Sequence, residues 1–429
     1  MATTTMTPEA YEAYIRKHER WNFIINTADL TFFFFATSFI YGSTVLSLYA
    51  SHLTDRKWLI GLLPAIQNVG YFLPQLLAAR RAERLPRKKP MVVMFSVVER
   101  LPYILVTLTI FLWPGAPRWF SYSVVAICVG LATISGGLGG PAWNGMLAKV
   151  IRPERRGFFF GLSNAMGGLL GMAGAKITEG VLADPRWGYP RSYGICFLFC
   201  FIFQVVSWIF LTLNREPPQE SNKEGPSAME YWRRLPGVLG SNPNFARYLG
   251  GRVLLILGGM ATAFYIIYAR STFQVTDSFA GSLTFAALAS QTVCTPLLGW
   301  LSDHRGHKWL TELAALIGLS AVMVALLAPG PQWFYLVFVL MNAASSAMMV
   351  AGMSLVMDFS PQHEVPTYAA LSSTLLAVPI LISPILGGWL ADNVGFGMLF
   401  IVAMVFFSLG WAMMHWGVRE PKRWQQAQE

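Results

Sequence analysis

The sequence Gly299-Trp-Leu-Ser-Asp303-His304-Arg305-Gly306-His307-Lys308 is a charged turn between two long apolar segments. An earlier stretch, also between two apolar segments, reads Ala79-Arg-Arg-Ala-Glu83-Arg84-Leu-Pro86-Arg87-Lys88. In each copy an acid lies four residues after a small residue, and a basic cluster follows it. A short charged turn that occurs twice at equivalent places predicts a duplicated membrane protein.

Further landmarks recur in the same order in both parts of the chain. The pairs are Pro114-Gly-Ala-Pro-Arg-Trp119-Phe120 with Pro329-Gly-Pro-Gln-Trp333-Phe334, Gly180-Val-Leu-Ala-Asp184 with Gly388-Trp-Leu-Ala-Asp392, and Arg215-Glu-Pro217 with Arg419-Glu-Pro421. Compositional bias does not keep landmarks in register, so we predict two homologous halves.

The composition agrees with a chain whose surface faces lipid. Apolar residues make up 54% of the 429 residues and charged residues only 13%, whereas soluble domains have about 25% charged residues. Apolar stretches of roughly 20 residues, the length that crosses a bilayer core, occur twelve times. We place them near 22–48, 58–79, 91–113, 119–147, 157–183, 193–213, 246–269, 278–301, 309–328, 334–357, 366–391 and 395–417. The predicted fold class is therefore an all-α membrane protein of twelve transmembrane helices in two six-helix bundles.

The segments outside the spans define the expected domain organisation. Residues 1–21 form a polar N-terminal segment with an amphipathic surface helix at Pro8 to Arg20, and no cleavable signal is expected there. The bundles occupy 22–213 and 246–418. Between them, 214–245 is a linker with a second amphipathic piece at Ala228 to Leu239, and 419–429 is a tail. We expect both amphipathic pieces to lie along the headgroups.

The net charge of +10 reflects orientation in a membrane and not nucleic-acid binding. Most of the 32 Lys and Arg residues fall on one side of the predicted spans, as the positive-inside rule requires. This places both termini in the cytoplasm, makes the halves parallel repeats and brings the basic clusters to anionic lipid headgroups. We expect an integral protein of a prokaryotic plasma or inner membrane.

Motifs for enzyme chemistry or cofactors are missing from the sequence. The four cysteines lie inside predicted spans, without a CxxC or Cys/His cluster, so neither zinc nor a disulfide framework is indicated. No P-loop, dinucleotide fingerprint or nucleophile motif occurs. We expect a chain that is not an enzyme and binds no cofactor or metal.

With its repeated loop and paired six-span halves, the chain resembles the major facilitator superfamily over essentially its whole length. The family loop runs Gly, three residues, Asp-Arg, one residue, Gly, then two basic residues. The second copy matches it at Gly299, Asp303, Gly306 and Lys308 and has His304 where Arg is usual. The first copy keeps Arg84, Arg87 and Lys88 but has Ala79 and Pro86 in place of the glycines and Glu83 in place of the Asp. The resemblance implies alternating access, a mostly monomeric protein and a gate formed by these loops. The gate candidates are Ala79, Glu83, Arg84, Arg87, Lys88, Gly299, Asp303, Arg305, Gly306 and Lys308.

A carboxylate within the first span is the main candidate for carrying a proton. Asn22, Asn26 and Asp29 follow i, i+4, i+7 and so form one polar stripe. An acid in a partly dry cavity takes up a proton near neutral pH. The alternative is a static ion pair, for which Arg252 in the seventh span is the expected partner.

The fifth span departs from the resemblance. Drug antiporters of the family carry Gly-Pro-x-x-Gly-Gly there, whereas this chain has Ala175-Lys176-Ile-Thr-Glu179-Gly180. Lys176 and Glu179, at i and i+3, either neutralise each other or line the cavity and bind a charged solute.

Other polar residues within spans are assigned by the resemblance. Spans one, two, seven, eight and ten face the axis in this family, which makes cavity candidates of Gln67, Asn68, Gln291 and Asn342. The third span is peripheral, so the adjacent Glu99 and Arg100 are interpreted as structural groups that bond neighbouring helices.

These observations predict a secondary active transporter that moves a small organic solute by alternating access. Proton coupling is favoured because of Asp29. The aromatic, apolar character of the spans favours amphipathic or drug-like solutes over sugars. The alternatives are a facilitative uniporter and a receptor or sensor that keeps the fold without transport, and an intramembrane enzyme is a third choice.

Overall fold

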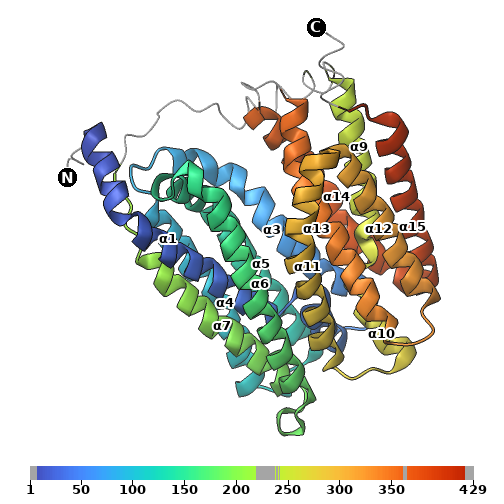
Figure 1. The fold of residues 1–429 in the computed structure, drawn as a ribbon. Helices are drawn as coiled ribbons and strands as arrows, with labels where there is room; N and C mark the ends of the chain where they lie inside the picture. Colours follow the sequence, from blue (N-terminus) through green and yellow to red (C-terminus); the bar gives the residue numbers. More distant parts are fainter. Residues whose placement is uncertain (1–6, 219–236, 238–239, 241, 361–364, 421–429) are drawn as a thin grey trace. The chain divides into compact units, whose positions relative to one another are not determined.

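The computed structural model describes residues 7–218, 237, 240, 242–360 and 365–420. Helices account for nearly all of this part of the chain, in the order that Figure 1 shows. The first-half helices are α1 (Pro8–Ser38), η1 (Gly42–Leu46), α2 (Ser47–Leu53), α3 (Lys57–Glu83), α4 (Lys89–Leu112), α5 (Arg118–Val150), α6 (Pro153–Ala183), η2 (Pro185–Trp187) and α7 (Arg191–Thr212). The second-half helices are α9 (Pro243–Gly258), η3 (Gly259–Phe264), α10 (Tyr265–Phe273), α11 (Phe279–Arg305), α12 (His307–Leu327), α13 (Trp333–Phe359), α14 (Val365–Asn393), α15 (Phe396–Ala412) and η4 (Met413–Gly417).

All twelve expected spans coincide with helical segments. Ten segments of the described chain are long and apolar enough to cross a membrane. The other two expected spans are α3 and α11, with 27 residues each, which at 1.5 Å per residue gives about 40 Å and is enough to cross. Their middles carry amides such as Gln67, Asn68 and Gln291, as expected of helices with a polar face. The predicted fold class is confirmed.

Equivalent caps begin the first helix of each half. The Thr7 hydroxyl accepts a hydrogen bond from the Ala10 N–H at 3.3 Å, and the Asn242 side chain accepts one from the Phe245 N–H at 3.0 Å. A proline follows each cap residue, where its missing N–H costs nothing. The expected surface helix Pro8 to Arg20 is not separate from the first span: α1 runs without a break from Pro8 to Ser38. The second amphipathic piece, Ala228 to Leu239, lies almost wholly outside the described residues.

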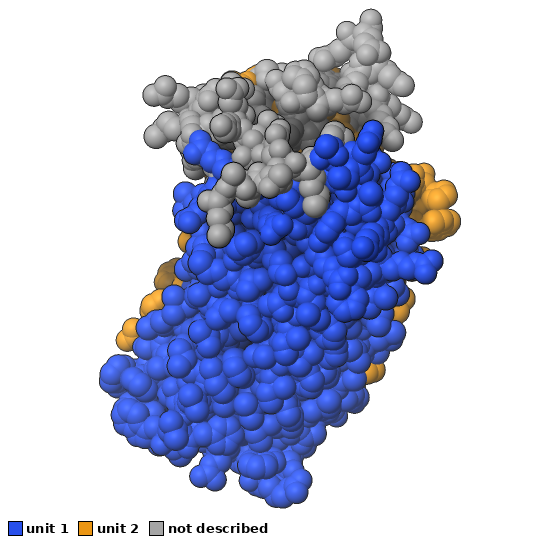
Figure 2. Space-filling model, turned by 90° about the vertical axis from the view of Figure 1, so that its left-hand side faces the viewer, with its two compact units in different colours: residues 1–40, 66–228 blue, residues 41–65, 229–429 orange. Residues whose placement is uncertain are grey.

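The chain forms two compact units (Figure 2). Unit 1 comprises Met1–Ile40 and Ile66–Ala228, and unit 2 comprises Tyr41–Ala65 and Met229–Glu429. The units therefore follow the two halves except at Tyr41–Ala65, which is the end of the first span, α2 and the start of α3. Within unit 2, η1 contacts α11 and η3, and α2 contacts α10.

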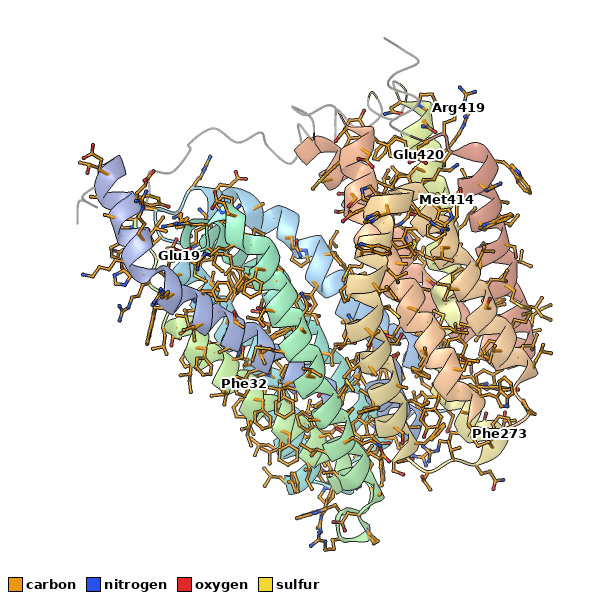
Figure 3. All side chains as sticks on the ribbon, in the orientation of Figure 1. Glu19, Phe32, Phe273, Met414, Arg419 and Glu420 are labelled. Atoms are coloured by element: carbon orange, nitrogen blue, oxygen red, sulfur yellow. The ribbon has the colours of Figure 1, made fainter. Side chains whose placement is uncertain are left out.

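The repeat of the halves extends to single hydrogen bonds. In unit 1, the Asn22 side chain donates to the Arg215 carbonyl at 3.0 Å and accepts from the Arg215 N–H at 2.9 Å. In unit 2, Asn244 makes the same pair of bonds to Arg419, at 3.0 and 2.8 Å. Arg419 (labelled in Figure 3) belongs to one of the repeated Arg-Glu-Pro landmarks. In each half, the backbone of the landmark arginine after the sixth span is thus hydrogen-bonded to an asparagine of the first helix.

Close packing within unit 1 depends on small residues and aromatic rings. A Cβ on Gly137 of α5 would lie 2.4 Å from the Gly70 carbonyl oxygen of α3, so these two helices cross at a distance that only glycine allows. Between α1 and α7, the Phe32 ring (Figure 3) stacks on Phe203 and Phe210, with ring centroids 6.4 and 5.7 Å apart. These contacts pack α1, α3, α5 and α7 around a cavity.

Candidate functional site

A cavity of about 270 Å³ lies inside unit 1, between α1, α3, α4, α5 and α7. Aromatic and aliphatic side chains form most of its wall, among them Phe33, Phe95 and Trp143. Its charged lining residues are Asp29, Glu99 and Arg100, and its other polar lining residues are Tyr71, Gln75, Ser96, Ser135 and Asn144. An apolar wall around a small charged cluster is the usual composition of a small-molecule site.

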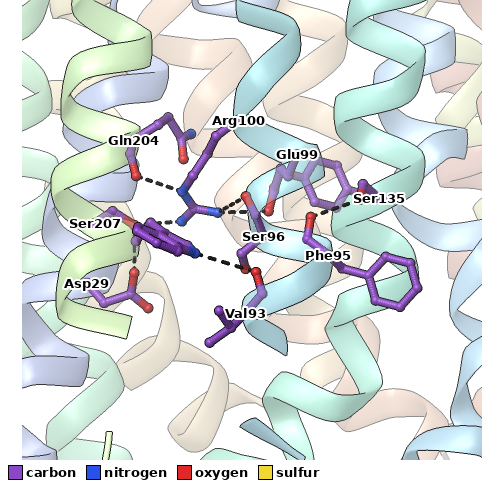
Figure 4. Close-up of polar contacts among 11 residues, drawn as sticks. Asp29, Val93, Phe95, Ser96, Glu99, Arg100, Ser135, Gln204 and Ser207 are labelled. Atoms are coloured by element: carbon purple, nitrogen blue, oxygen red, sulfur yellow. Dashed lines mark hydrogen bonds and ion pairs between the residues drawn. The ribbon is translucent and has the colours of Figure 1, made fainter. Parts of the chain in front are cut away.

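Arg100 is the centre of the charged cluster (Figure 4). It is only 4% exposed. Its Nε donates to the Gln204 carbonyl of α7 at 2.6 Å and its Nη1 to the Ser96 carbonyl at 2.9 Å. Its Nη2 donates to the Ser207 hydroxyl at 2.9 Å, and the Glu99 carboxylate lies 3.4 Å from Nη1. The guanidinium thus bonds α4 to α7, as the structural interpretation predicted, while also lining the cavity.

Asp29 joins this cluster through one hydroxyl group. Ser207 accepts from Arg100 and donates to Asp29 Oδ1 at 2.6 Å, while the Glu99 carboxylate accepts from the Tyr71 hydroxyl at 2.6 Å. Asp29 and Glu99 are 5% and 7% exposed. Two carboxylates share one guanidinium here, so the cluster is electrically neutral only when one proton is bound. Buried uncompensated charge is costly, so the charge balance of this cluster is its main electrostatic feature.

Sequence reasoning did not place Glu99 and Arg100 beside Asp29, and it missed Tyr71, Gln204 and Ser207. The signal was available in part, because an acid and an arginine in the middle of an apolar span need partners of their own. Nothing in the sequence identified Ser207 as the group that connects Asp29 to Arg100.

Asn26, the other polar group of the first-span stripe, lies outside the cavity. Its side chain donates to the Asn214 side chain at 2.6 Å and to the Asn22 carbonyl at 2.7 Å. Asn214 donates back to the Asn26 oxygen at 3.1 Å. With its hydrogen-bonding capacity used in this way, Asn26 has a structural position at the end of the bundle.

A second, uncharged cavity of about 200 Å³ lies in unit 2 and brings together two sequence candidates, Gln291 of α11 and Asn342 of α13. The Tyr41 hydroxyl donates to the Asn342 side-chain oxygen at 3.0 Å. The remaining lining residues are Ser43, Thr262, Met341, Ser345, Ser346 and Met349. Hydroxyl, amide and thioether groups can bind polar or amphipathic molecules without a countercharge.

Arg252, the expected static partner of Asp29, belongs to unit 2, and each residue has other partners in its own unit. Arg252 Nη1 lies 3.5 Å from the Tyr248 hydroxyl and 3.4 Å from the Met348 carbonyl. Both contacts are at the limit for hydrogen bonds, and the buried Nε makes none with the described residues.

The remaining candidates within spans lie outside both cavities. Lys176 Nζ contacts Glu179 Oε2 at 2.8 Å, and both side chains lie at the surface of α6, 55% and 31% exposed. This ion pair corresponds to the first of the two alternatives for the i, i+3 pair, in which Lys176 and Glu179 neutralise each other. Gln67 is half-buried and Asn68 is exposed on α3, and their roles stay predictions.

The first charged loop is bonded to the end of the sixth span. The Glu216 carboxylate accepts from the Lys88 and Lys89 N–H groups at 2.9 and 2.7 Å, and from Lys149 Nζ at 3.0 Å. Lys88 thus contributes its backbone to a helix-capping contact. Of the other candidates in this loop, Ala79 is half-buried, and Glu83, Arg84 and Arg87 are exposed.

The second charged loop turns at Gly306, whose φ of +96° favours glycine. Lys308 Nζ lies 3.3 Å from the Glu312 carboxylate, and the Arg305 guanidinium lies 5.1 Å from the Trp309 ring centroid. Gly299 has open space beside it. Asp303, like Glu83, is exposed and makes no hydrogen bond or ion pair with the part of the chain that the structure describes. The gate role of both acids stays a prediction.

Comparison with known proteins identifies the family. The model of the Major Facilitator Superfamily matches residues 29–270 and 248–429. The chain is 24% identical over 370 residues to the uncharacterized MFS-type transporter YfkF of Bacillus subtilis, covering 85% of this chain and 88% of that protein. It is 23% identical over 180 residues to the inner membrane metabolite transport protein YgcS of Escherichia coli, covering 42% and 39%.

Solved structures agree on the fold. A D-xylose-proton symporter superposes with a TM-score of 0.70 at 16% identity, covering 93% of this chain and 98% of that one. The nucleoside transporter NupG gives a TM-score of 0.69 at 10% identity, covering 92% and 97%. These relatives are transporters and not enzymes, in agreement with the prediction for this chain. The chain therefore belongs to the major facilitator superfamily and is an integral membrane protein of two six-helix halves.

Proposed function

We propose that the protein is a proton-coupled secondary transporter of a small organic solute, with Asp29 as the group that takes up and releases the proton. The observation that supports this assignment is the charge balance of the unit 1 cavity. Asp29, Glu99 and Arg100 leave one negative charge uncompensated in a buried space unless a proton is bound. Alternating access then lets that proton enter from one side of the membrane and leave on the other.

Asp29 is the better proton carrier of the two acids because Glu99 is held more directly. Glu99 contacts the Arg100 guanidinium and accepts from Tyr71, which favours its charged form. Asp29 reaches Arg100 only through the Ser207 hydroxyl. A solute that entered the cavity and changed this contact would change proton binding at Asp29, which is how solute and proton movements become coupled.

The composition of the cavities favours an amphipathic or drug-like solute. The unit 1 cavity has an apolar wall around its charged cluster, and the unit 2 cavity contributes Tyr41, Asn342 and two methionines without a charge. We further propose that the protein acts as a monomer in a prokaryotic plasma or inner membrane, with both termini and the basic loops on the cytoplasmic side. It needs no cofactor besides the coupling proton.

The test begins with the purified protein in detergent, whose melting temperature is screened against drugs, lipophilic cations, sugars and organic acids at two pH values. A ligand that binds the folded state raises the melting temperature. The stabilising class is then offered to proteoliposomes that contain a pH-sensitive dye. A solute gradient should acidify or alkalinise the lumen with the wild type and not with Asp29→Asn.

Asp184→Asn is the matched control, because Asp184 is a loop acid that pairs with Arg186 outside the cavity. Proton movement that persists in Asp29→Asn would exclude Asp29 as the carrier. Solute flux without proton movement in the wild type would identify a uniporter, and ligand stabilisation without flux would identify a receptor.

A further inference from the structure

A pocket of about 510 Å³ lies at the basic end of unit 1, apart from the charged cavity, and shares no lining residue with it. We call it the basic pocket. It is formed where the N-terminal turns of α1, the start of α4 and the segment after α7 meet. Its lining residues are Tyr14, Arg87, Lys89, Pro90, Val93, Asn214, Arg215 and Glu216.

The single carboxylate of the basic pocket is already neutralised. Glu216 is 6% exposed, pairs with Lys149 Nζ at 3.0 Å and accepts two backbone N–H groups at the start of α4. The Lys149 ammonium matches the single negative charge of Glu216, so this one carboxylate cannot also offset the full charge of the other cations of the pocket.

Three cations therefore remain without a countercharge. Arg87 is exposed and makes no hydrogen bond or ion pair with the described residues. Lys89 Nζ donates to the Asn214 carbonyl at 2.9 Å, and Arg215 Nη1 donates to His18 Nδ1 at 3.0 Å. Neither of these two neutral acceptors balances a charge. In the same loop, burial lowers the pKa of Lys88 and the neighbouring Lys149 ammonium lowers it further, while the carboxylates of Glu216 and Glu83 act in the opposite direction.

The surroundings of Arg215 place the pocket beside an apolar surface. Its guanidinium lies 4.9 Å from the ring centroid of Trp21, and the Trp21 indole N–H donates to the Leu213 carbonyl at 3.0 Å. Trp21, Ile24 and Leu213 are large apolar side chains exposed at the protein surface. Trp21 and Ile24 are three residues apart on α1 and so share a face. A tryptophan under a basic group is typical of the level of lipid headgroups.

We propose that the basic pocket binds the phosphate of an anionic phospholipid, with Arg87 and Arg215 as its main ligands and an acyl chain along Trp21, Ile24 and Leu213. Guanidinium groups bind phosphate oxygens through paired N–H donors, and the Tyr14 hydroxyl is available as a further donor from α1. The neighbouring apolar face is the reason to assign the phosphate to a lipid and not to a soluble ion. This site does not depend on the identity of the transported solute or on proton coupling.

The experiment measures the melting temperature of the full-length protein in a neutral detergent as phosphatidylglycerol, phosphatidylcholine or inorganic phosphate is added. Phosphatidylglycerol should stabilise the wild type at lower concentration than phosphatidylcholine does, and inorganic phosphate at millimolar concentration should have little effect. An arginine that lies against an anionic headgroup contributes about a fivefold change in affinity for anionic lipid. Arg87→Gln and Arg215→Gln should therefore each raise the concentration of phosphatidylglycerol needed by about that factor.

Arg81→Gln is the matched control, because Arg81 is an exposed arginine at the end of α3 that does not line the pocket. It should keep the wild-type response. Arg87→Gln removes a side chain without described partners and should fold normally, so the test does not rest on Arg215→Gln alone. Equal stabilisation by the two lipids, or an equal loss in Arg81→Gln and Arg87→Gln, would show only general attraction to a basic surface and would overturn the proposal. Stabilisation by inorganic phosphate that Arg87→Gln abolishes would overturn the lipid assignment in favour of a soluble phosphate site.

Discussion

The carboxylate of Asp392, at the end of α14, caps the start of α3 by accepting the Lys57 backbone N–H at 2.9 Å. It also accepts the Trp58 N–H at 3.1 Å, and Lys57 Nζ donates to the Ala391 carbonyl at 2.9 Å. A residue of the second half thus supplies the helix cap that the first half lacks at this point. The contact explains why the start of α3 belongs to unit 2.

Asp392→Ala should destabilise the protein by about 1 kcal/mol, the usual cost of removing a helix cap, whereas Asp392→Asn should retain much of the contact. Thermal unfolding in detergent measures the difference. Asp184→Ala is the control, because Asp184 is the counterpart of Asp392 in the repeated landmark, but its carboxylate bonds locally to the backbone and guanidinium of Arg186 in the same loop. Equal effects at the two aspartates would show that the contact with α3 contributes nothing specific.

Ser207→Ala should destabilise unit 1 by roughly 1–3 kcal/mol, because it leaves a buried charged donor and a buried carboxylate without their shared hydroxyl. Ser135→Ala removes a neutral hydrogen bond to the Phe95 carbonyl, 2.8 Å long, and should cost less. Both variants can be compared in the same unfolding assay. A Ser207→Ala protein as stable as Ser135→Ala would mean that Asp29 and Arg100 do not depend on the bridge.

Arg100→Met should be among the most destabilising single changes, because it leaves two buried carboxylates without a cation; breaking a buried pair costs about 3–5 kcal/mol. Addition of Asp29→Asn should recover part of that loss by removing one of the two charges. A double-mutant cycle measures the coupling energy. Strictly additive effects would show that Asp29 and Arg100 do not interact.

The Arg100→Met variant should also depend on pH in a defined direction. Its buried carboxyls are tolerated when protonated, so the folded state binds more protons than the unfolded state and stability falls as pH rises. Melting temperatures measured from pH 5 to 8 should therefore diverge from those of the wild type towards the alkaline end. A constant difference across this range would contradict the charge-balance argument.

Gly137→Ala should weaken the crossing of α3 and α5, because the added methyl group would meet the Gly70 carbonyl at 2.4 Å and backbone cannot move as a side chain does. Overpacking of this kind costs about 1–3 kcal/mol. Gly161→Ala on α6 is the control: its Cβ would meet nothing within 4 Å, and alanine favours the helix. The two variants should move the melting temperature in opposite directions.

Much of the architecture could be predicted from the sequence because the bilayer imposes a simple rule. A span must satisfy its own backbone and present apolar side chains over about 20 residues, and both requirements can be read from composition. The two matched loops and the Arg-Glu-Pro landmarks located the repeat correctly. The helix Pro8–Ser38 shows what polarity does not determine. The polar residues up to Arg20 suggested a separate surface helix, whereas the backbone continues as one helix into the first span.

The fold class, the duplication and the presence of Asp29 as a charge inside an apolar span could be read from the sequence alone, because such a charge is conspicuous wherever the span packs. Which groups surround that charge depends on how the helices pack. Ser207 lies 178 residues from Asp29, and Arg100 reaches Gln204 across 104 residues, separations that carry no local pattern. Helix packing sets such pairs through the rotation of each helix about its axis, and that rotation results from the sum of many weak contacts that no single motif encodes.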